Sequence, residues 1–160
     1  MPFIRVAGDM TIALNSGSVN TAAEIEFPKL QEIGGTLTLG TNRNANNITF
    51  PLLKKILGSC SVTTYKLKND IEFTNLESIG TDGADAQIKF EIEATNILCP
   101  KLKTINGKFD IATSSFMFDM EVDKVSYPNV ESISENLSIT CPYSDFGSNG
   151  ILSIDFSGLK

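Results

Sequence analysis

The sequence predicts a mostly β chain that folds as a parallel, right-handed β-solenoid with few or no helices. Three observations support this fold class. A short unit recurs along nearly the whole chain, each unit contains two apolar pairs of period 2, and no segment keeps a helical period over ten residues. Because one such unit cannot bury its own apolar face, its copies are expected to stack.

The first half of the unit has the form Ile-x-Phe-Pro-x-Leu. Its copies occupy residues 25–30, 48–53, 71–76, 97–102, 125–130 and 154–159. Ile-x-Phe predicts a short strand with both apolar side chains on one face, and the proline, which lacks an N–H, predicts a corner after that strand. The Phe-like positions are 23 to 29 residues apart, which predicts about six turns of 23–29 residues.

The second half of the unit reads Ile-x-Gly-x-Leu-x-Ile. It occurs at residues 33–39, 56–62, 105–111 and 133–139, and residues 6–12 fit the same pattern. Leu-x-Ile predicts a second strand, and the glycine before it predicts a tight bend or a positive φ. Glu135 stands at this glycine position in one copy. The alternating runs 87–93 and 116–122 predict lengthened strands.

Composition argues against several functional classes. The formal net charge is −6 and only two arginines are present, so a nucleic-acid surface is not expected. No 18-residue apolar run predicts a membrane span within this chain. With no histidine in the sequence, Ser-His-Asp and Cys-His catalysis are excluded. We therefore expect no enzyme activity and no cofactor.

The three cysteines, Cys60, Cys99 and Cys141, lack the spacing of a zinc site. The repeat places Cys60 and Cys99 where other copies carry Leu or Phe, which predicts small buried apolar side chains at both positions.

Residues 1–160 are expected to form one solenoid domain, and this domain is interpreted as part of a longer repeat array. Both ends of the sequence interrupt a repeat, so an apolar end face needs a cover. End-to-end contact with further repeats or with another copy would supply it.

Taken together, residues 3–159 and their repeated Phe-Pro-x-Leu-x-x-Ile-x-Gly-x-Leu-x-Ile unit resemble the receptor L-domain type of leucine-rich solenoid, seen in insulin and EGF receptor ectodomains. They also resemble the related repeats of fungal cell-wall proteins and of surface leucine-rich proteins of gut Bacteroidetes. The resemblance implies a cell-surface or extracellular protein. It further implies a non-enzymatic recognition or adhesion module whose ligand is a protein or a glycan.

The candidate binding surface is the polar column between the inward-facing strand residues. Stacked turns would gather these side chains on one flat face, but every half-exposed sheet needs a polar face, so solvent exposure alone also explains them. Its residues are Thr11, Thr36, Thr38, Ser59, Ser61, Lys108, Asp110 and Ser138.

The candidate acidic patch consists of Asp119, Glu121 and Asp123, which the alternation places on one strand face. These carboxylates could bind calcium, or could serve as the acid and base of a carbohydrate-active β-helix enzyme. A polar strand face opposite apolar residues also explains them. A structural spacer that binds nothing is a third alternative.

Overall fold

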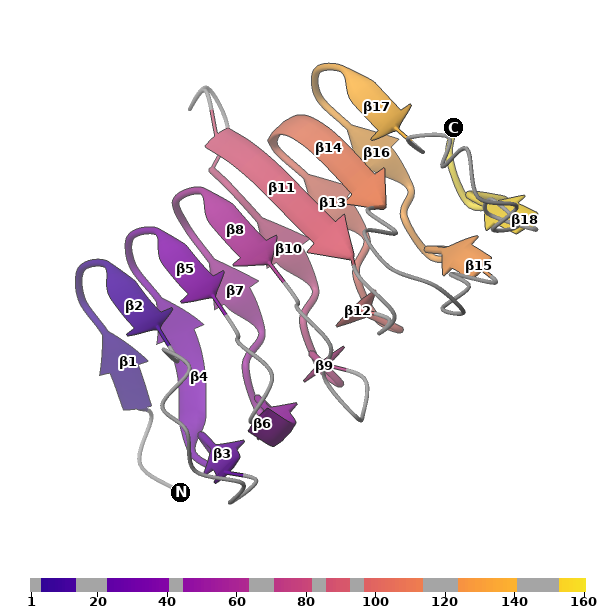
Figure 1. Ribbon diagram of the computed structural model, residues 1–160. Helices are drawn as coiled ribbons and strands as arrows, with labels where there is room; N and C mark the ends of the chain where they lie inside the picture. Colours follow the sequence, from indigo (N-terminus) through magenta and orange to yellow (C-terminus); the bar gives the residue numbers. More distant parts are fainter. Residues whose placement is uncertain are drawn as a thin grey trace.

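A computed structural model describes residues 4–13, 23–40, 45–63, 71–81, 86–92, 97–113, 124–140 and 153–160. In these ranges the chain winds as a parallel β-solenoid, and its two ends lie at opposite ends of the stack (Figure 1). The described residues contain strands and turns but no helix, as the sequence predicts.

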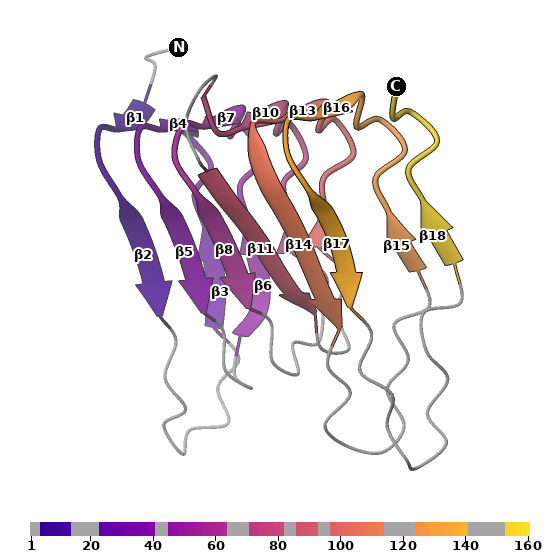
Figure 2. The ribbon, with the colours of Figure 1, turned by 90° about the horizontal axis from the view of Figure 1, so that it is seen from above.

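The first sheet has six parallel strands in the order β1-β4-β7-β10-β13-β16. It forms one wall of the solenoid, seen along the upper edge of Figure 2. Its strands are β1 (Ile4–Val6), β4 (Leu30–Ile33), β7 (Lys55–Ile56), β10 (Ser78–Ile79), β13 (Thr104–Ile105) and β16 (Ser132–Ile133).

The second sheet also has six parallel strands, in the order β17-β14-β11-β8-β5-β2. Figure 2 shows these strands lying side by side in one row. They are β2 (Met10–Ala13), β5 (Leu37–Gly40), β8 (Cys60–Thr63), β11 (Ala86–Ile92), β14 (Gly107–Thr113) and β17 (Leu137–Thr140). The seven-residue β11 confirms the lengthened strand expected at 87–93, whereas the run 116–122 lies outside the described residues.

The third sheet is interrupted. Four strands pair in the order β12-β9-β6-β3, while β15 and β18 form a separate parallel pair (Figure 1). The strands are β3 (Ala23–Glu26), β6 (Ala45–Thr49), β9 (Ile71–Glu72), β12 (Ile97–Leu98), β15 (Lys124–Ser126) and β18 (Ser153–Asp155). All three sheets are continuous together only from β3 to β12, over which the chain completes three circuits. The closed solenoid therefore has about three turns, not the six that the repeat count predicts.

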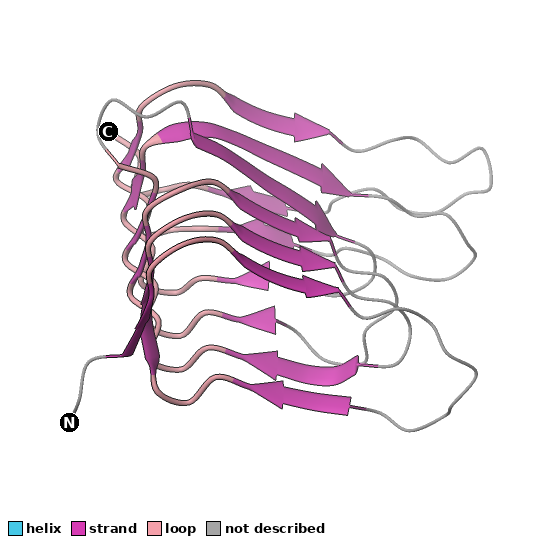
Figure 3. Ribbon diagram, turned by 90° about the vertical axis from the view of Figure 1, so that its left-hand side faces the viewer, coloured by secondary structure: helices cyan, strands magenta, loops and turns pink. Residues whose placement is uncertain are grey.

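Figure 3 shows the strands of the sheets stacked on different sides of the solenoid. The core between them consists of apolar columns that run along the stack. Ile33, Ile56, Ile79 and Ile105 form one column and are all fully buried. Phe27, Phe50 and Phe73 stack with ring centroids 5.0 and 5.1 Å apart and nearly parallel planes. These spacings match the separation of neighbouring strands, about 4.8 Å, so each layer contributes one ring to a continuous stack.

The predicted corners after the short strands are β-turns, in the copies with proline and in the two that carry Thr74 and Ser157 instead. The Leu30 amide donates to the Phe27 carbonyl across 3.3 Å, and the same bond closes every copy of the unit. Proline fits the second position of such a turn because its φ is already near −65° and no amide is required there.

The glycine before the second strand has a different role from the one expected at Gly58. Its φ is not positive, but a Cβ there would lie 2.7 Å from the carbonyl carbon of Gly35 in the preceding layer. Close approach of two backbones therefore requires the glycine. Gly107, with φ near +149°, does have the expected positive φ.

Charges alternate at one corner of the stack, next to the first sheet. The main-chain amides and carbonyls of successive layers are hydrogen-bonded there at 2.8 to 3.2 Å. The charges of the side chains alternate in sign along this column from Lys54 onward. The column runs Gln31, Lys54, Glu77, Lys103, Glu131 and Lys160. Like charges are thereby kept two layers apart, which favours this register of the layers over a shift by one.

Candidate functional site

The structure brings five of the eight predicted binding residues into a single row on the outward side of the second sheet. Lys89, which the prediction did not include, occupies the same row between Ser61 and Asp110. In strand order, the row reads Thr11, Thr38, Ser61, Lys89, Asp110 and Ser138. Neighbouring strands place these side chains about 4.8 Å apart.

The other three predicted residues, Thr36, Ser59 and Lys108, lie next to this row, at or just before the start of their strands. The Ser59 hydroxyl accepts a 3.0 Å hydrogen bond from the amide of Gln87 in the next layer. Lys108 Nζ lies 3.9 Å from Glu135 Oε2, also one layer away. These contacts hold successive layers together, so part of the predicted surface also has a structural role.

The face changes character along the stack. Thr11 and Thr38 are exposed and Ser61 is half-buried, so the N-terminal half presents small hydroxyl groups. Lys108 and Asp110 are exposed in the C-terminal half, where cations and carboxylates lie on adjacent strands. Such a mixed face offers both hydrogen-bonding groups and separated charges of both signs. We refer to the eight predicted binding residues together with Lys89 as the polar face.

The predicted acidic patch, Asp119, Glu121 and Asp123, lies outside the described residues. Within the described ranges, no group of three or more acidic, cysteine or histidine side chains is arranged to hold a metal ion.

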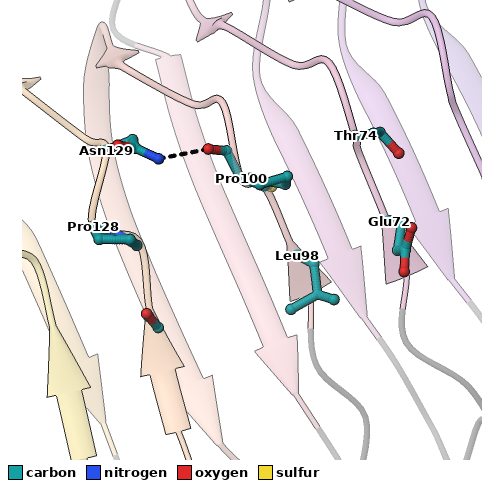
Figure 4. A pocket seen from close by; sticks show the side chains of 8 residues that line it. Glu72, Thr74, Leu98, Pro100, Pro128 and Asn129 are labelled. Carbon is teal, nitrogen blue, oxygen red and sulfur yellow. Dashed lines mark hydrogen bonds between the residues drawn. The ribbon is translucent and has the colours of Figure 1, made fainter.

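A pocket of about 390 Å³ lies where the third sheet is interrupted (Figure 4). Leu98, at the end of β12, lies between Glu72 on β9 and the Pro128 corner that follows β15. The lining residues are Glu72, Thr74, Leu98, Cys99, Pro100, Ser126, Pro128 and Asn129. No motif in the sequence predicts this pocket.

Main-chain hydrogen bonds show where the ladder stops. The amides of Phe27, Phe50 and Phe73 each donate to the carbonyl at the end of the next third-sheet strand, at 2.9 to 3.3 Å. The equivalent bond from Cys99 to Ser126 does not form, and among the described residues the Cys99 amide has no main-chain acceptor. The ladder resumes one layer later, where the Tyr127 amide donates to the Asp155 carbonyl across 2.8 Å. We call this gap between β12 and β15 the ladder gap.

Side chains also link the two layers at the ladder gap. The buried Tyr127 hydroxyl donates to the Ile97 carbonyl at 3.0 Å. The Asn129 side-chain amide donates to the Pro100 carbonyl at 2.7 Å, as the Asn75 side chain does to the Pro51 carbonyl where the ladder is continuous. In a continuous parallel ladder, an amide of the next strand would bond to the Ile97 carbonyl. The phenol replaces that donor, so the buried acceptor remains satisfied.

Cys99, which lines the pocket, has the buried Cys60 as a neighbour. Cys60 and Cys99 are free and almost fully buried, which confirms the prediction made from the repeat, and Cys141 lies outside the described residues. Burial raises the pKa of the Cys60 thiol from 9.0 to about 12. Burial, together with the neighbouring Cys60, also raises the pKa of Cys99. Both groups are therefore neutral at physiological pH, which does not favour a nucleophilic role.

One sequence signal for the ladder gap exists in retrospect. The Phe-like column carries phenylalanine in three successive copies and then Cys99 and Tyr127. Cys99 has no ring, and Tyr127 carries a hydroxyl that needs a hydrogen-bond partner, so the stack of phenylalanine rings ends at Phe73. Lys89 was missed because an insertion before β11 interrupts the repeat alignment there.

Comparison with known proteins gives no match to a family model, a curated protein or a solved structure. The described residues also include no helix with the length and apolar character needed to span a membrane. The chain is thus defined by its architecture, a parallel β-solenoid with a flat polar face and a pocket at the ladder gap.

Proposed function

We propose that this chain is a non-enzymatic recognition or adhesion module of an exported surface protein, and that it binds a protein or glycan through the polar face. The solenoid would be right-handed and of the leucine-rich, receptor L-domain type. The repeat resemblance supports the surface location and the repeat type.

The observation that carries the proposal is the row of outward side chains on the second sheet. Six parallel strands hold it, and buried residues on the opposite side of the four middle strands, β5, β8, β11 and β14, fix the register there. A rigid, flat row some 24 Å long, at about 4.8 Å per strand, suits a repeating ligand or the surface of a folded protein. Such a surface needs little ordering on binding, which favours affinity.

The test is a binding screen of the full chain against glycan and matrix-protein arrays, followed by variants. Thr38→Arg and Asp110→Arg would place a bulky cation in the polar face. Ser132→Arg makes the same kind of change at an exposed position on the first sheet and serves as the matched control. The proposal predicts that any ligand found loses at least about tenfold in affinity with the first two variants and is unaffected by the control.

Two outcomes would contradict the proposal. If all three variants affect binding equally, the polar face is not the binding surface. If the chain releases reducing sugar from a polysaccharide, and Asp119→Asn with Glu121→Gln abolishes that release, the chain is a carbohydrate-active enzyme instead.

We also infer contact at the ends of the stack with further repeats or another copy. Ile4 is 38% exposed at one end, and Ile154 and Leu159 are 56% and 42% exposed at the other. Strand edges of the same polarity are available at both ends, so head-to-tail contact would extend the sheets. Sedimentation of the full chain and of Ile154→Lys over a range of concentrations tests this inference. A chain that stays monomeric at high concentration rules out contact between copies.

A further inference from the structure

We propose that the ladder gap is a second binding site, which takes an extended peptide carrying a basic side chain as an added parallel strand along the edge of β12. This site lies on the third sheet, away from the polar face, and does not depend on the function proposed above.

The first argument is the main-chain chemistry of the gap. By analogy with Phe27, Phe50 and Phe73, the amide of Cys99 is expected to donate to the Ser126 carbonyl, but this hydrogen bond does not form. An unpaired strand edge is a template for another strand, and an extended peptide supplies carbonyls at the spacing that such an edge requires. A carbohydrate offers no matching series of acceptors, so the peptide is the favoured class of ligand.

The second argument is the size and lining of the pocket. Its volume, about 390 Å³, falls within the range of ligand sites in proteins. Leu98, Pro100 and Pro128 supply apolar surface, and the two prolines belong to corners whose turns are closed by hydrogen bonds. The Asn129–Pro100 bond of 2.7 Å joins these corners across the gap, so the upper wall of the pocket is preformed (Figure 4).

The third argument is charge. Glu72 lines the pocket and is exposed, at the outward position between the buried Ile71 and Phe73. The same outward column carries Glu26 at one end of the stack and Asp155 at the other, and no residue of the column is a cation. A lysine or arginine on the peptide would be drawn to Glu72, whereas an acidic side chain would be repelled.

The Tyr127 bond explains how the gap persists without a ligand. Its hydroxyl satisfies the Ile97 carbonyl from inside the core, so closure of the ladder is not needed to avoid a buried unpaired acceptor. The Ile97 carbonyl is therefore already bonded, while the amide of Cys99, beside the pocket, has no main-chain acceptor among the described residues.

The test uses three synthetic hexapeptides with blocked ends: alternating valine and lysine (VKVKVK), alternating valine and glutamate (VEVEVE), and VKVKVK with alternate amides methylated. Each is titrated into the ¹⁵N-labelled full chain while the amide resonances are followed by NMR. VKVKVK is expected to shift the resonances of Leu98, Cys99 and Ser126, with the Cys99 amide moving downfield as it gains a hydrogen bond. VEVEVE and the methylated peptide should bind at least about fivefold more weakly.

Variants separate the site from its surroundings. Glu72→Gln should weaken VKVKVK binding about two- to fivefold, the range expected for one exposed charge pair. Glu77→Gln removes an exposed carboxylate from the same layer that does not line the pocket, so it should have no effect. Asp110→Arg, on the polar face, should also leave peptide binding unchanged, which keeps this test independent of the first proposal.

Three results would overturn the inference. The first is that VKVKVK causes no shift near Cys99 at about 5 mM, well above the dissociation constant expected for a short strand. The second is equal binding of the methylated peptide, which would exclude strand pairing. The third is that cellohexaose, a carbohydrate probe, shifts the Cys99 amide while the peptides do not.

Discussion

The hydroxyl of Tyr127 donates a 3.0 Å hydrogen bond to the main-chain carbonyl of Ile97, one layer earlier in the solenoid. Both residues are buried, so this bond lies in the interior, where an unsatisfied carbonyl would be costly. A side chain therefore makes a contact that the backbone makes elsewhere in the third sheet.

Tyr127→Phe should lower the free energy of unfolding by about 1–3 kcal/mol, because the Ile97 carbonyl loses its donor while the ring is retained. Urea denaturation followed by circular dichroism measures the difference. Ser126→Ala is the control, since it removes only a partly buried, 3.4 Å side-chain contact with Asp155. An unchanged midpoint for Tyr127→Phe would mean that water or another group satisfies the carbonyl.

Gly58→Ala should destabilise the fold, whereas Gly8→Ala at the same repeat position should not. A Cβ at Gly58 would meet the Gly35 backbone at 2.7 to 2.8 Å, but a Cβ at Gly8 has open space around it. Separating two layers to admit a methyl group costs on the order of 1–3 kcal/mol, comparable to overpacking a core. Thermal unfolding of both variants measures this, and equal melting temperatures would contradict the close-approach explanation.

Alkaline pH should destabilise the folded chain. Burial holds the pKa of Cys60 at about 12 and raises those of Cys99 and Tyr127 above their usual values. Between pH 9 and 12 the unfolded chain loses these protons while the folded chain keeps them. The stability is therefore complete below pH 9 and falls by up to about 1.4 kcal/mol per pH unit for each group.

Urea denaturation at a series of pH values from 8 to 11 measures that loss, with Cys60→Ala as the comparison. Removing one of the three groups should make the decline less steep. A decline of the same slope in both proteins would show that Cys60 does not keep its proton in the folded state.

Lys160→Met should raise the pKa of Glu131. In the folded chain a 3.0 Å contact from Lys160 Nζ lowers this pKa below 4.5, first through the hydrogen bond and then through the charge, with a smaller contribution from Lys103. NMR titration of the Glu131 side chain measures it directly. Lys103→Met should give a smaller rise, and an equal rise for both variants would contradict the assignment of the main cause to Lys160.

Much of the architecture follows from the sequence because the repeat constrains it strongly. Leu37 and Leu39 are buried while Thr38 between them is exposed, as a period of two requires. The row through Thr11, Thr38 and Ser61 was predictable for the same reason, since equivalent repeat positions must stack. The proline corners were predictable from the missing amide.

The ladder gap was not predictable, because a pattern of apolar positions does not report hydrogen bonds. Cys99 and Tyr127 both satisfy the pattern and are both buried, yet neither continues the ring stack of Phe27, Phe50 and Phe73. The number of repeats therefore overestimated the number of turns in which all three sheets are continuous. The sequence motif indicated that glycine is needed at position 58, but for a tight bend or a positive φ. The actual reason is the close approach of the Gly35 backbone in the neighbouring layer, which a local motif does not reveal.

The most direct test of the account is amide hydrogen exchange at the Phe-like column. The account predicts that the Cys99 amide exchanges much faster than the amides of Phe50 and Phe73, which are bonded to the next layer at 3.3 and 2.9 Å. Addition of the VKVKVK peptide should then slow exchange at Cys99 alone. If Cys99 is as well protected as Phe73 in the absence of any peptide, the ladder is continuous there and the proposed strand-binding site does not exist.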